Sequence, residues 1–276
     1  MRGVSATRTM ASMAVDRTAH FMSTLGELRY QATGRRVRAL RDGVVVADTD
    51  NAILVLEPRR VVGQYAFPVA HVHAELAADD SAPAVEHALG LDGRSILDPS
   101  TGFGFHTAPG QTLSVGGVAG AGFRFAEDPL RDVVALDFDA FEWLEEAEPL
   151  FGHPRDPMHR IDVRISDKTV TVALGGDVVA ESSRPLVLFE GLLPPRYYLP
   201  PADVHVDLVR SETATTCAYK GHATHWSIGD HADVAWSYPE PARELSMIAG
   251  LVSFYQERTD VTVDGKPLGR PQTPWS

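Results

Sequence analysis

The sequence contains a single cysteine, Cys217, among its 276 residues. One thiol cannot form an intrachain disulfide, and it cannot supply the paired cysteines of a Cys₄ or Cys₂His₂ zinc site. A chain that uses no disulfides suits a reducing compartment, so we expect a cytoplasmic location. The sequence also lacks a run of about 18 apolar residues and a signal-peptide core, so we expect neither membrane insertion nor export.

Positive charge is scarce: 25 Lys and Arg face 37 Asp and Glu, which gives a formal net charge of −12. Such a surface repels nucleic acids and anionic membranes at long range, so we expect neither as a partner. The first 41 residues are an exception, with eight arginines and two acidic residues. We assign residues 1–34 to a basic N-terminal arm, which is either an unstructured segment or a transit peptide.

The sequence is rich in turn formers, with 23 Gly and 19 Pro, and it contains an internal repeat. Residues 42–49 resemble residues 176–182, and the matching order continues through Leu54–Leu56 with Leu186–Leu188 and through Tyr65–Pro68 with Tyr197–Pro200. We therefore expect two copies of one domain, at residues 35–155 and 160–270. The first copy has an insertion at residues 77–100, a lid or a surface excursion, with a possible helix over residues 84–91.

Each copy shows the pattern of short strands. Residues 169–174 and 178–180 flank Gly175 and Gly176, and residues 222–228 and 232–238 flank a second Gly-Asp turn, so each pair predicts a β-hairpin. Helical signals are brief: a capping box from Asp139 to Glu142, and an apolar face within residues 242–249. The fold class is therefore mostly β (α+β), with each copy a curved antiparallel sheet that carries one short helix.

Lys220 is one of only three lysines in a chain that has 22 arginines. A lysine in such a chain suggests a compact ammonium for an anion contact or acid–base chemistry, although it also fits a solvated loop. Tyr219 and Gly221 flank it, and Trp226 follows. Cys217 lies nearby and is either a nucleophile that basic neighbours activate or a small buried thiol.

His153, Arg155 and Asp156 lie beside Pro154 and Pro157 at the boundary between the copies. The prolines restrict the backbone, so this loop would present an imidazole, a guanidinium and a carboxylate together. We favour an interdomain clasp for this loop. A clasp is compatible with a ligand site, because pockets often form where domains meet.

The string around Cys217, Tyr219, Lys220, Gly221 and Trp226 resembles the signature of the bacterial and fungal domain of unknown function numbered 427. The strings at residues 153–157, 197–200 and 236–239 fit the same family. The resemblance covers nearly the whole chain after about residue 35, so it implies a tandem member of that family with two β-tent-like domains. In the first copy, residues 101–110 stand where the Cys-x-Tyr-Lys-Gly string is expected, which implies one site per chain.

Some labels of that family mention nucleotidyl transfer, but the sequence does not support this chemistry. Nucleotidyl transfer needs a phosphate-binding glycine loop and paired carboxylates for a divalent metal. The pair Asp137 and Asp139 is better explained by a helix cap. His71 and His73, or His222 with His225 and His231, offer two or three metal ligands, but His222 and His225 fall on opposite faces of the predicted strand. We therefore expect no metal site and no cofactor.

These observations predict an aromatic pocket in the second copy that binds a small anionic or carbonyl-bearing molecule, held by Lys220 and Arg155. The alternative is an acid–base enzyme, a cyclase, hydrolase or isomerase, that uses the same pocket. A further alternative is an interaction scaffold without a ligand. The candidate catalytic residues are Lys220, Tyr219, His153 and His225, and the candidate ligand-binding residues are Tyr197, Tyr198, Arg155, Asp156, Trp226, Trp236, Tyr238 and Cys217.

Overall fold

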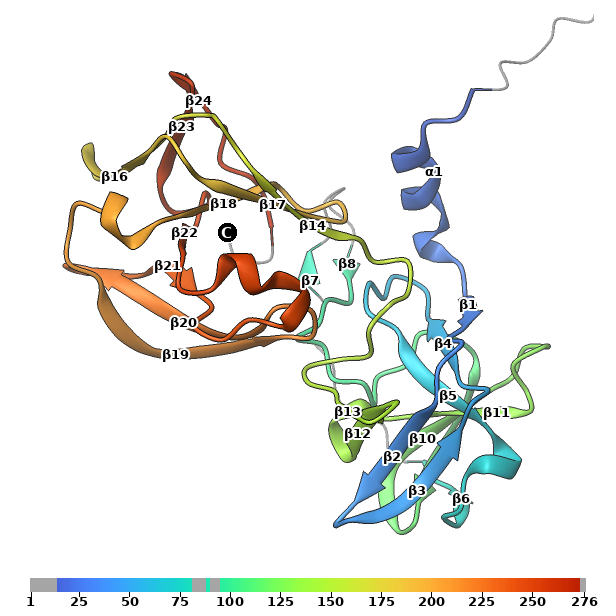
Figure 1. Ribbon diagram of the computed structural model, residues 1–276. Coiled ribbons are helices and arrows are strands. Elements are labelled where there is room, and N and C mark those ends of the chain that lie inside the picture. Colours follow the sequence, from blue (N-terminus) through green and yellow to red (C-terminus); the bar gives the residue numbers. More distant parts are fainter. Residues whose placement is uncertain (1–13, 81–87, 90–94, 274–276) are drawn as a thin grey trace, which may run out of the picture.

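The computed structural model describes residues 14–80, 88–89 and 95–273. It shows two β-rich domains that lie side by side and are joined by the segment between β13 and β14 (Figure 1). Each domain contains one seven-stranded and one four-stranded antiparallel sheet. The predicted mostly-β fold is therefore confirmed. No helix among the described residues is long and apolar enough to cross a membrane.

The first domain begins within the residues that the sequence assigned to the basic arm, because β1 pairs with β4. In sheet order, its seven strands are β1 (Arg29–Ala32), β4 (Ile53–Leu56), β5 (Gln64–Pro68), β11 (Val133–Leu136), β10 (Val118–Phe125), β9 (Gly110–Val115) and β6 (Leu76–Ala78). Its four-stranded sheet contains β13 (Glu148–Pro149), β12 (Glu142–Glu145), β2 (Val37–Arg41) and β3 (Val44–Thr49).

The second domain repeats this strand order. Its seven strands are β14 (Ile161–Ile165), β17 (Leu186–Glu190), β18 (Arg196–Leu199), β22 (Val252–Phe254), β21 (His231–Ser237), β20 (Gly221–Ile228) and β19 (Val209–Cys217). Its four-stranded sheet contains β16 (Asp177–Ser182), β15 (Val170–Leu174), β23 (Asp260–Val263) and β24 (Lys266–Pro267). The isolated bridges Ala47–Val72 and Ala180–Val204 also occupy equivalent places in the two domains.

Both predicted hairpins are confirmed. β15 pairs with β16 across Gly175 and Gly176, whose φ angles of 62° and 98° lie in the region that favours glycine. β20 pairs with β21, with Trp226 opposite Ala235 and His225 opposite Trp236. Alternate residues of these strands point to opposite faces of the sheet, as the two-residue period requires.

The helices are short, and one prediction is wrong. Asp137, and not Asp139, caps the 3₁₀ helix η3 (Phe138–Ala140), and Trp143 lies buried in β12. Trp143 packs against Phe138 with ring centroids 5.1 Å apart, so core packing outweighs the local capping pattern. The remaining helices are α1 (Arg17–Ser23), η1 (Thr24–Gly26), η2 (Val69–His71), η4 (Pro201–Asp203) and η5 (Arg243–Ile248).

The predicted segment 242–249 forms the 3₁₀ helix η5, which buries Leu245 and Ile248. Most of the predicted helix over residues 84–91 lies outside the described residues. Its two described residues form the strand β7 (Ala88–Leu89), which pairs with β8 (Ser95–Ile96). These two residues are therefore extended and not helical.

The large sheet of the second domain is covered on both faces. One face packs against the four-stranded sheet through Leu199, Ala235 and Phe254. The other face packs against η5 through Tyr198, Trp236 and Tyr238. A buried apolar side chain in the central strands of this sheet therefore belongs to one of two separate clusters, according to its position along the strand.

Candidate functional site

The five aromatic side chains predicted to wall one pocket do not converge. Tyr197 and Trp226 pack in the cluster between the two sheets, whereas Tyr198, Trp236 and Tyr238 pack on the outer face under η5. Tyr197 and Tyr198 are neighbours on β18, so they point to opposite faces. The prediction of a single aromatic pocket is therefore wrong.

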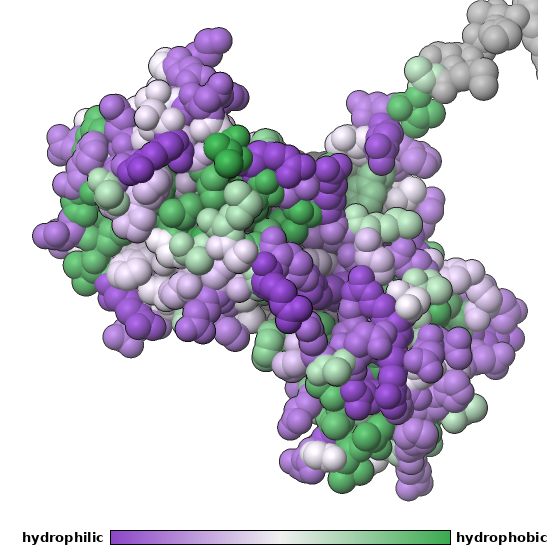
Figure 2. All heavy atoms as spheres, in the orientation of Figure 1, coloured by the Kyte–Doolittle hydropathy of each residue, from purple (hydrophilic) through white to green (hydrophobic). Residues whose placement is uncertain are grey.

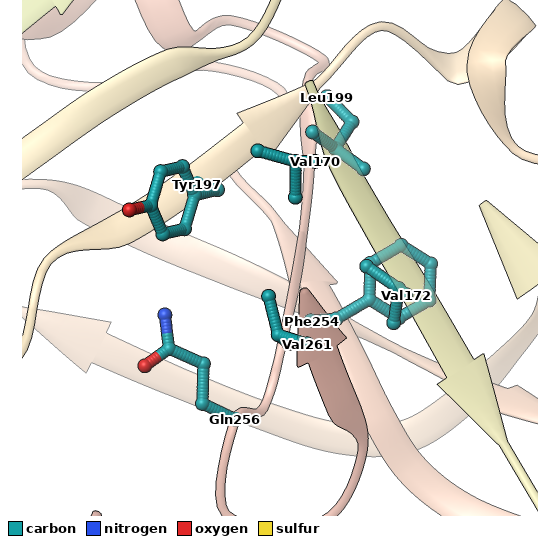
Figure 3. A pocket seen from close by; sticks show the side chains of 7 residues that line it. All are labelled: Val170, Val172, Tyr197, Leu199, Phe254, Gln256 and Val261. Carbon is teal, nitrogen blue, oxygen red and sulfur yellow. The ribbon is translucent and has the colours of Figure 1, made fainter. Parts of the chain in front are cut away.

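The indole N–H groups of the two predicted pocket tryptophans are hydrogen-bonded to neighbouring side chains instead. The Trp236 indole N–H donates to the Tyr198 hydroxyl at 3.2 Å, and the Trp226 indole N–H donates to the Ser237 hydroxyl at 2.9 Å. A cavity beside Tyr197 has a volume of about 10 Å³, which is room for about one water molecule. Figure 3 shows its lining, which combines the apolar side chains of Val170, Val172, Leu199, Phe254 and Val261 with Tyr197 and the amide of Gln256.

Lys220 lies at a different place, in an ion pair at the end of β17. Its Nζ donates to Glu190 Oε2 at 2.5 Å, and each side chain is only 11% exposed. Lys220 belongs to the turn between β19 and β20, and Gly221 supports that turn with a φ of +96°. A buried charge pair is costly to desolvate, so its presence here requires good geometry and further polar partners.

Two histidines and one tyrosine surround this pair. His159 Nε2 lies 3.5 Å from Glu190 Oε1, and the His159 ring stacks on the Tyr219 ring with centroids 4.3 Å apart. The His153 ring meets the edge of Tyr219 at 5.7 Å. We call His153, His159, Glu190, Tyr219 and Lys220 the junction cluster. Hydrophilic side chains cover the region where the two domains meet (Figure 2).

The protonation states of the junction cluster are set by burial and by charge. Burial opposes ionisation of Glu190, but His159 and Lys220 outweigh it and lower the pKa of Glu190 to about 2. Burial raises the pKa of Tyr219, so its hydroxyl keeps its proton at neutral pH. Burial also lowers the pKa of His153, against the opposing effect of its hydrogen bond with the Pro154 carbonyl.

The tautomer of His153 follows from that hydrogen bond. Its Nδ1 lies 2.8 Å from the Pro154 carbonyl oxygen, which can only accept, so Nδ1 carries the proton. Nε2 of the neutral ring is then an acceptor. His153 is 9% exposed and interacts electrostatically with His159, Glu190 and Lys220, which places it in the same cluster.

The Pro-bracketed loop, residues 153–157, connects the two domains, and we call it the clasp. The Asp156 carboxylate accepts from Gln31 of the first domain at 2.8 Å, and the Asp156 backbone N–H donates to the Tyr219 hydroxyl at 2.7 Å. The Arg155 guanidinium lies 5.4 Å from the centre of the Tyr219 ring and 3.5 Å from Glu244. The loop therefore touches both domains beside the junction cluster.

His225 and Cys217 lie outside the junction cluster. His225 is 3% exposed in β20, where Nε2 contacts the Thr215 hydroxyl at 2.9 Å, and burial lowers its pKa. Cys217 is a free, half-buried thiol that pairs with Gly221 across the β19–β20 hairpin. Within the described residues, no group of three or more His, Cys, Asp or Glu side chains has a geometry that could hold a metal.

The first domain has a carboxylate at the equivalent position. Tyr65 pairs with Leu54 and Tyr197 pairs with Val187, and three residues further along these strands come Glu57 and Glu190. Glu57 is 1% exposed. It accepts from His106 Nδ1 at 2.7 Å, Thr107 N at 2.6 Å, Ala108 N at 2.8 Å and Gln64 Nε2 at 3.3 Å. Four protein donors therefore surround the Glu57 carboxylate. At the equivalent position in the second domain, the lysine Lys220 donates to Glu190.

Sequence reasoning missed Glu190 and His159. Glu190 ends an apolar strand and is 30 residues from Lys220, so no local spacing connects them. The repeat did not reveal it either, because the match of Leu54–Leu56 with Leu186–Leu188 places Phe189 opposite Glu57, and only the strand pairing shifts this register by one residue. His159 follows the Pro-bracketed loop by two residues, and its role depends on where that loop folds.

Comparison with protein families gives a match, which lies in the second domain. Residues 162–265 match the model of a domain of unknown function, DUF427. The second domain is therefore a DUF427 domain, in agreement with the resemblance of its motifs. The matched range contains Glu190, Tyr219 and Lys220, whereas His153 and His159 precede it. No curated protein matches the chain.

Proposed function

We propose that this protein binds a small anionic or carbonyl-bearing molecule at the junction cluster. The buried Lys220–Glu190 pair carries this proposal, because it places two charges at a domain boundary where hydrophobic packing alone would serve stability as well. Groups that burial and a charged partner perturb are enriched at functional sites. The net charge of −12 and the single thiol fit a cytoplasmic protein with a small-molecule ligand rather than a nucleic acid.

Lys220 would supply the contact to the ligand. An ammonium has three N–H donors, and Lys220 uses one of them on Glu190. The other two have no acceptor among the described residues, although the side chain is only 11% exposed. A carboxylate or ketone oxygen would satisfy them. The Tyr219 hydroxyl and the partly exposed Arg155 guanidinium provide further donors nearby.

The comparison between the domains supports one site per chain. We propose that the first domain is a second, diverged DUF427 copy, because its strand order is the same. There, backbone and imidazole N–H groups surround Glu57, and the nearby cation, Arg60, is fully buried and directs its terminal guanidinium nitrogens to backbone carbonyl oxygens. In the second domain a long, flexible lysine takes the place of those backbone donors. The second site is therefore the one suited to a ligand.

A second candidate function is acid–base catalysis at the same cluster. It is favoured by His153, whose fixed tautomer offers an unprotonated Nε2, and by Glu190, which lies between His159 and Lys220. A neutral imidazole can accept a proton from a bound carbonyl compound, while the ammonium stabilises the negative oxygen that forms. We put the binding proposal first, because catalysis at this cluster also requires that the ligand binds there.

Thermal unfolding with small probes tests the binding proposal. The probes are acetate (a carboxylate), acetone (a ketone) and pyruvate (both), at matched ionic strength. A ligand that binds only the folded protein raises its melting temperature, so we expect pyruvate to give the largest shift. Lys220→Ala should abolish that shift, whereas the exposed control Lys266→Ala should keep it. An equal shift in the Lys220 variant would overturn the proposal.

A further inference from the structure

The junction cluster is not supported by the second domain alone. Gln31 lies in β1, an edge strand of the large sheet of the first domain. Its Nε2 donates to Asp156 Oδ1 at 2.8 Å, and the Asp156 backbone N–H donates to the Tyr219 hydroxyl at 2.7 Å. One residue of the clasp therefore connects a first-domain side chain with a member of the cluster.

The contacts continue from Tyr219 to the charge pair. The Tyr219 ring stacks on the His159 ring at a centroid distance of 4.3 Å and an interplanar angle of 24°. His159 Nε2 lies 3.5 Å from Glu190, which accepts from Lys220 on its other oxygen. A series of direct contacts thus runs from β1 of the first domain to Lys220.

A second side chain of the first domain holds the neighbouring residue of the clasp. The Tyr65 hydroxyl donates to Glu145 at 2.8 Å and is hydrogen-bonded to the backbone of Arg155. Arg155 in turn places its guanidinium over the Tyr219 ring. Two adjacent residues of the clasp are therefore fixed by the first domain, and both of them contact Tyr219.

These contacts fix the placement of the clasp more than its shape. Asp156 Oδ1 also accepts from the Met158 backbone N–H at 2.8 Å, so the loop has an internal turn of its own. Pro154 and Pro157 restrict the backbone further. Gln31 adds no further constraint within the loop. It determines where the preformed loop lies relative to Tyr219.

We propose that Gln31 is a positioning residue through which the first domain orients Tyr219 and His159 against Glu190 in the ligand site. The inference rests on the proposed function for its biological meaning, since it gives the first domain a supporting role at the proposed ligand site of the second domain. It gives a reason for the presence of both domains in one chain.

The test compares Gln31→Leu and Gln31→Glu with a control, Gln111→Leu, which alters an exposed glutamine of β9. The first readout is the titration of Glu190, followed by carboxyl-carbon NMR. Without Gln31 we expect His159 to move away from Glu190, so the pKa of Glu190 rises from about 2 toward its ordinary 4.5. The control should titrate like the wild type.

The second readout is pyruvate affinity, which should weaken several-fold, up to about tenfold, in both Gln31 variants, as expected for the loss of one hydrogen bond. Tyr219→Phe interrupts the same series of contacts, so its effect on Glu190 should not add to that of Gln31→Leu. A Glu190 titration that is unchanged in both Gln31 variants would overturn the inference, even if their melting temperatures fall. The titration needs no ligand, so failure of the wild type to bind pyruvate would count only against the proposed function.

Discussion

Glu57 and Glu190 occupy equivalent positions at the ends of β4 and β17, but their partners differ in kind. Glu57 accepts from two backbone N–H groups and an imidazole, whereas Glu190 accepts from the side chain of Lys220. Backbone donors are fixed by the fold, while a lysine side chain can move to share its donors with another molecule. This difference supports the proposal of a ligand site in the second domain.

Lys220→Met should destabilise the second domain, because it leaves the Glu190 carboxylate buried without its cation. Removing one partner of a buried ion pair typically costs about 3–5 kcal/mol. Lys266→Met, which changes an exposed lysine of β24, should lie within about 0.5 kcal/mol of the wild type. Urea unfolding monitored by fluorescence measures both values, and equal stabilities for the two variants would show that the Lys220–Glu190 pair has no energetic role.

The stability of the protein should depend on the ionisation of Glu190 in acid. Its folded-state pKa of about 2 lies below its ordinary 4.5, so its contribution is fully present above pH 4.5 and is lost as the pH falls toward 2. Glu190→Gln removes this contribution. The free energies of unfolding of the wild type and this variant should therefore converge between about pH 4.5 and 2. A constant difference across that range would contradict the assigned pKa.

Glu57→Gln should destabilise the first domain and leave the ligand site intact. A neutral amide presents an NH₂ group where the site supplies donors, so at least one buried N–H loses its acceptor, at a cost of about 1–3 kcal/mol. The pyruvate-induced rise in melting temperature should remain. Loss of that response in Glu57→Gln would place the ligand in the first domain instead.

Gly221→Ala should disturb the turn that carries Lys220. Gly221 has a φ of +96°, and an added Cβ would lie 3.3 Å from the carbonyl oxygen of Glu240. We expect a loss of about 1–3 kcal/mol in stability together with a weaker pyruvate response. Gly229→Ala is the matched control, since that turn glycine also has a positive φ but has open space around it. A normal pyruvate response in Gly221→Ala would show that the turn does not position Lys220.

Much of the fold could be predicted because its signals are local. The hairpin at β15 and β16 has its turn glycines between two β-branched runs, and the repeat predicted that the second domain would copy the first. The capping box at Asp139 failed because a local pattern cannot show that Trp143 is needed in the core beside Phe138. That outcome depended on tertiary packing.

The candidate site could be predicted only in part. The rarity of lysine singled out Lys220, and the prolines around Arg155 and Asp156 indicated a fixed loop at the junction. The prediction of an aromatic pocket failed because Tyr197 and Tyr198 are adjacent on one strand, so their side chains lie on opposite faces of the sheet. Glu190 and His159 reach Lys220 only through the pairing of distant strands, which no local pattern reveals.

The most direct test observes the Lys220 side chain itself. The chain has three lysines, so protein made with ¹³Cε-lysine gives three side-chain signals, and Lys220→Arg identifies the one that belongs to Lys220. We predict that pyruvate shifts the Lys220 signal in a saturable manner and leaves the signals of Lys168 and Lys266 unchanged. A Lys220 signal that does not respond, or three signals that shift equally, would contradict a ligand site at the junction cluster.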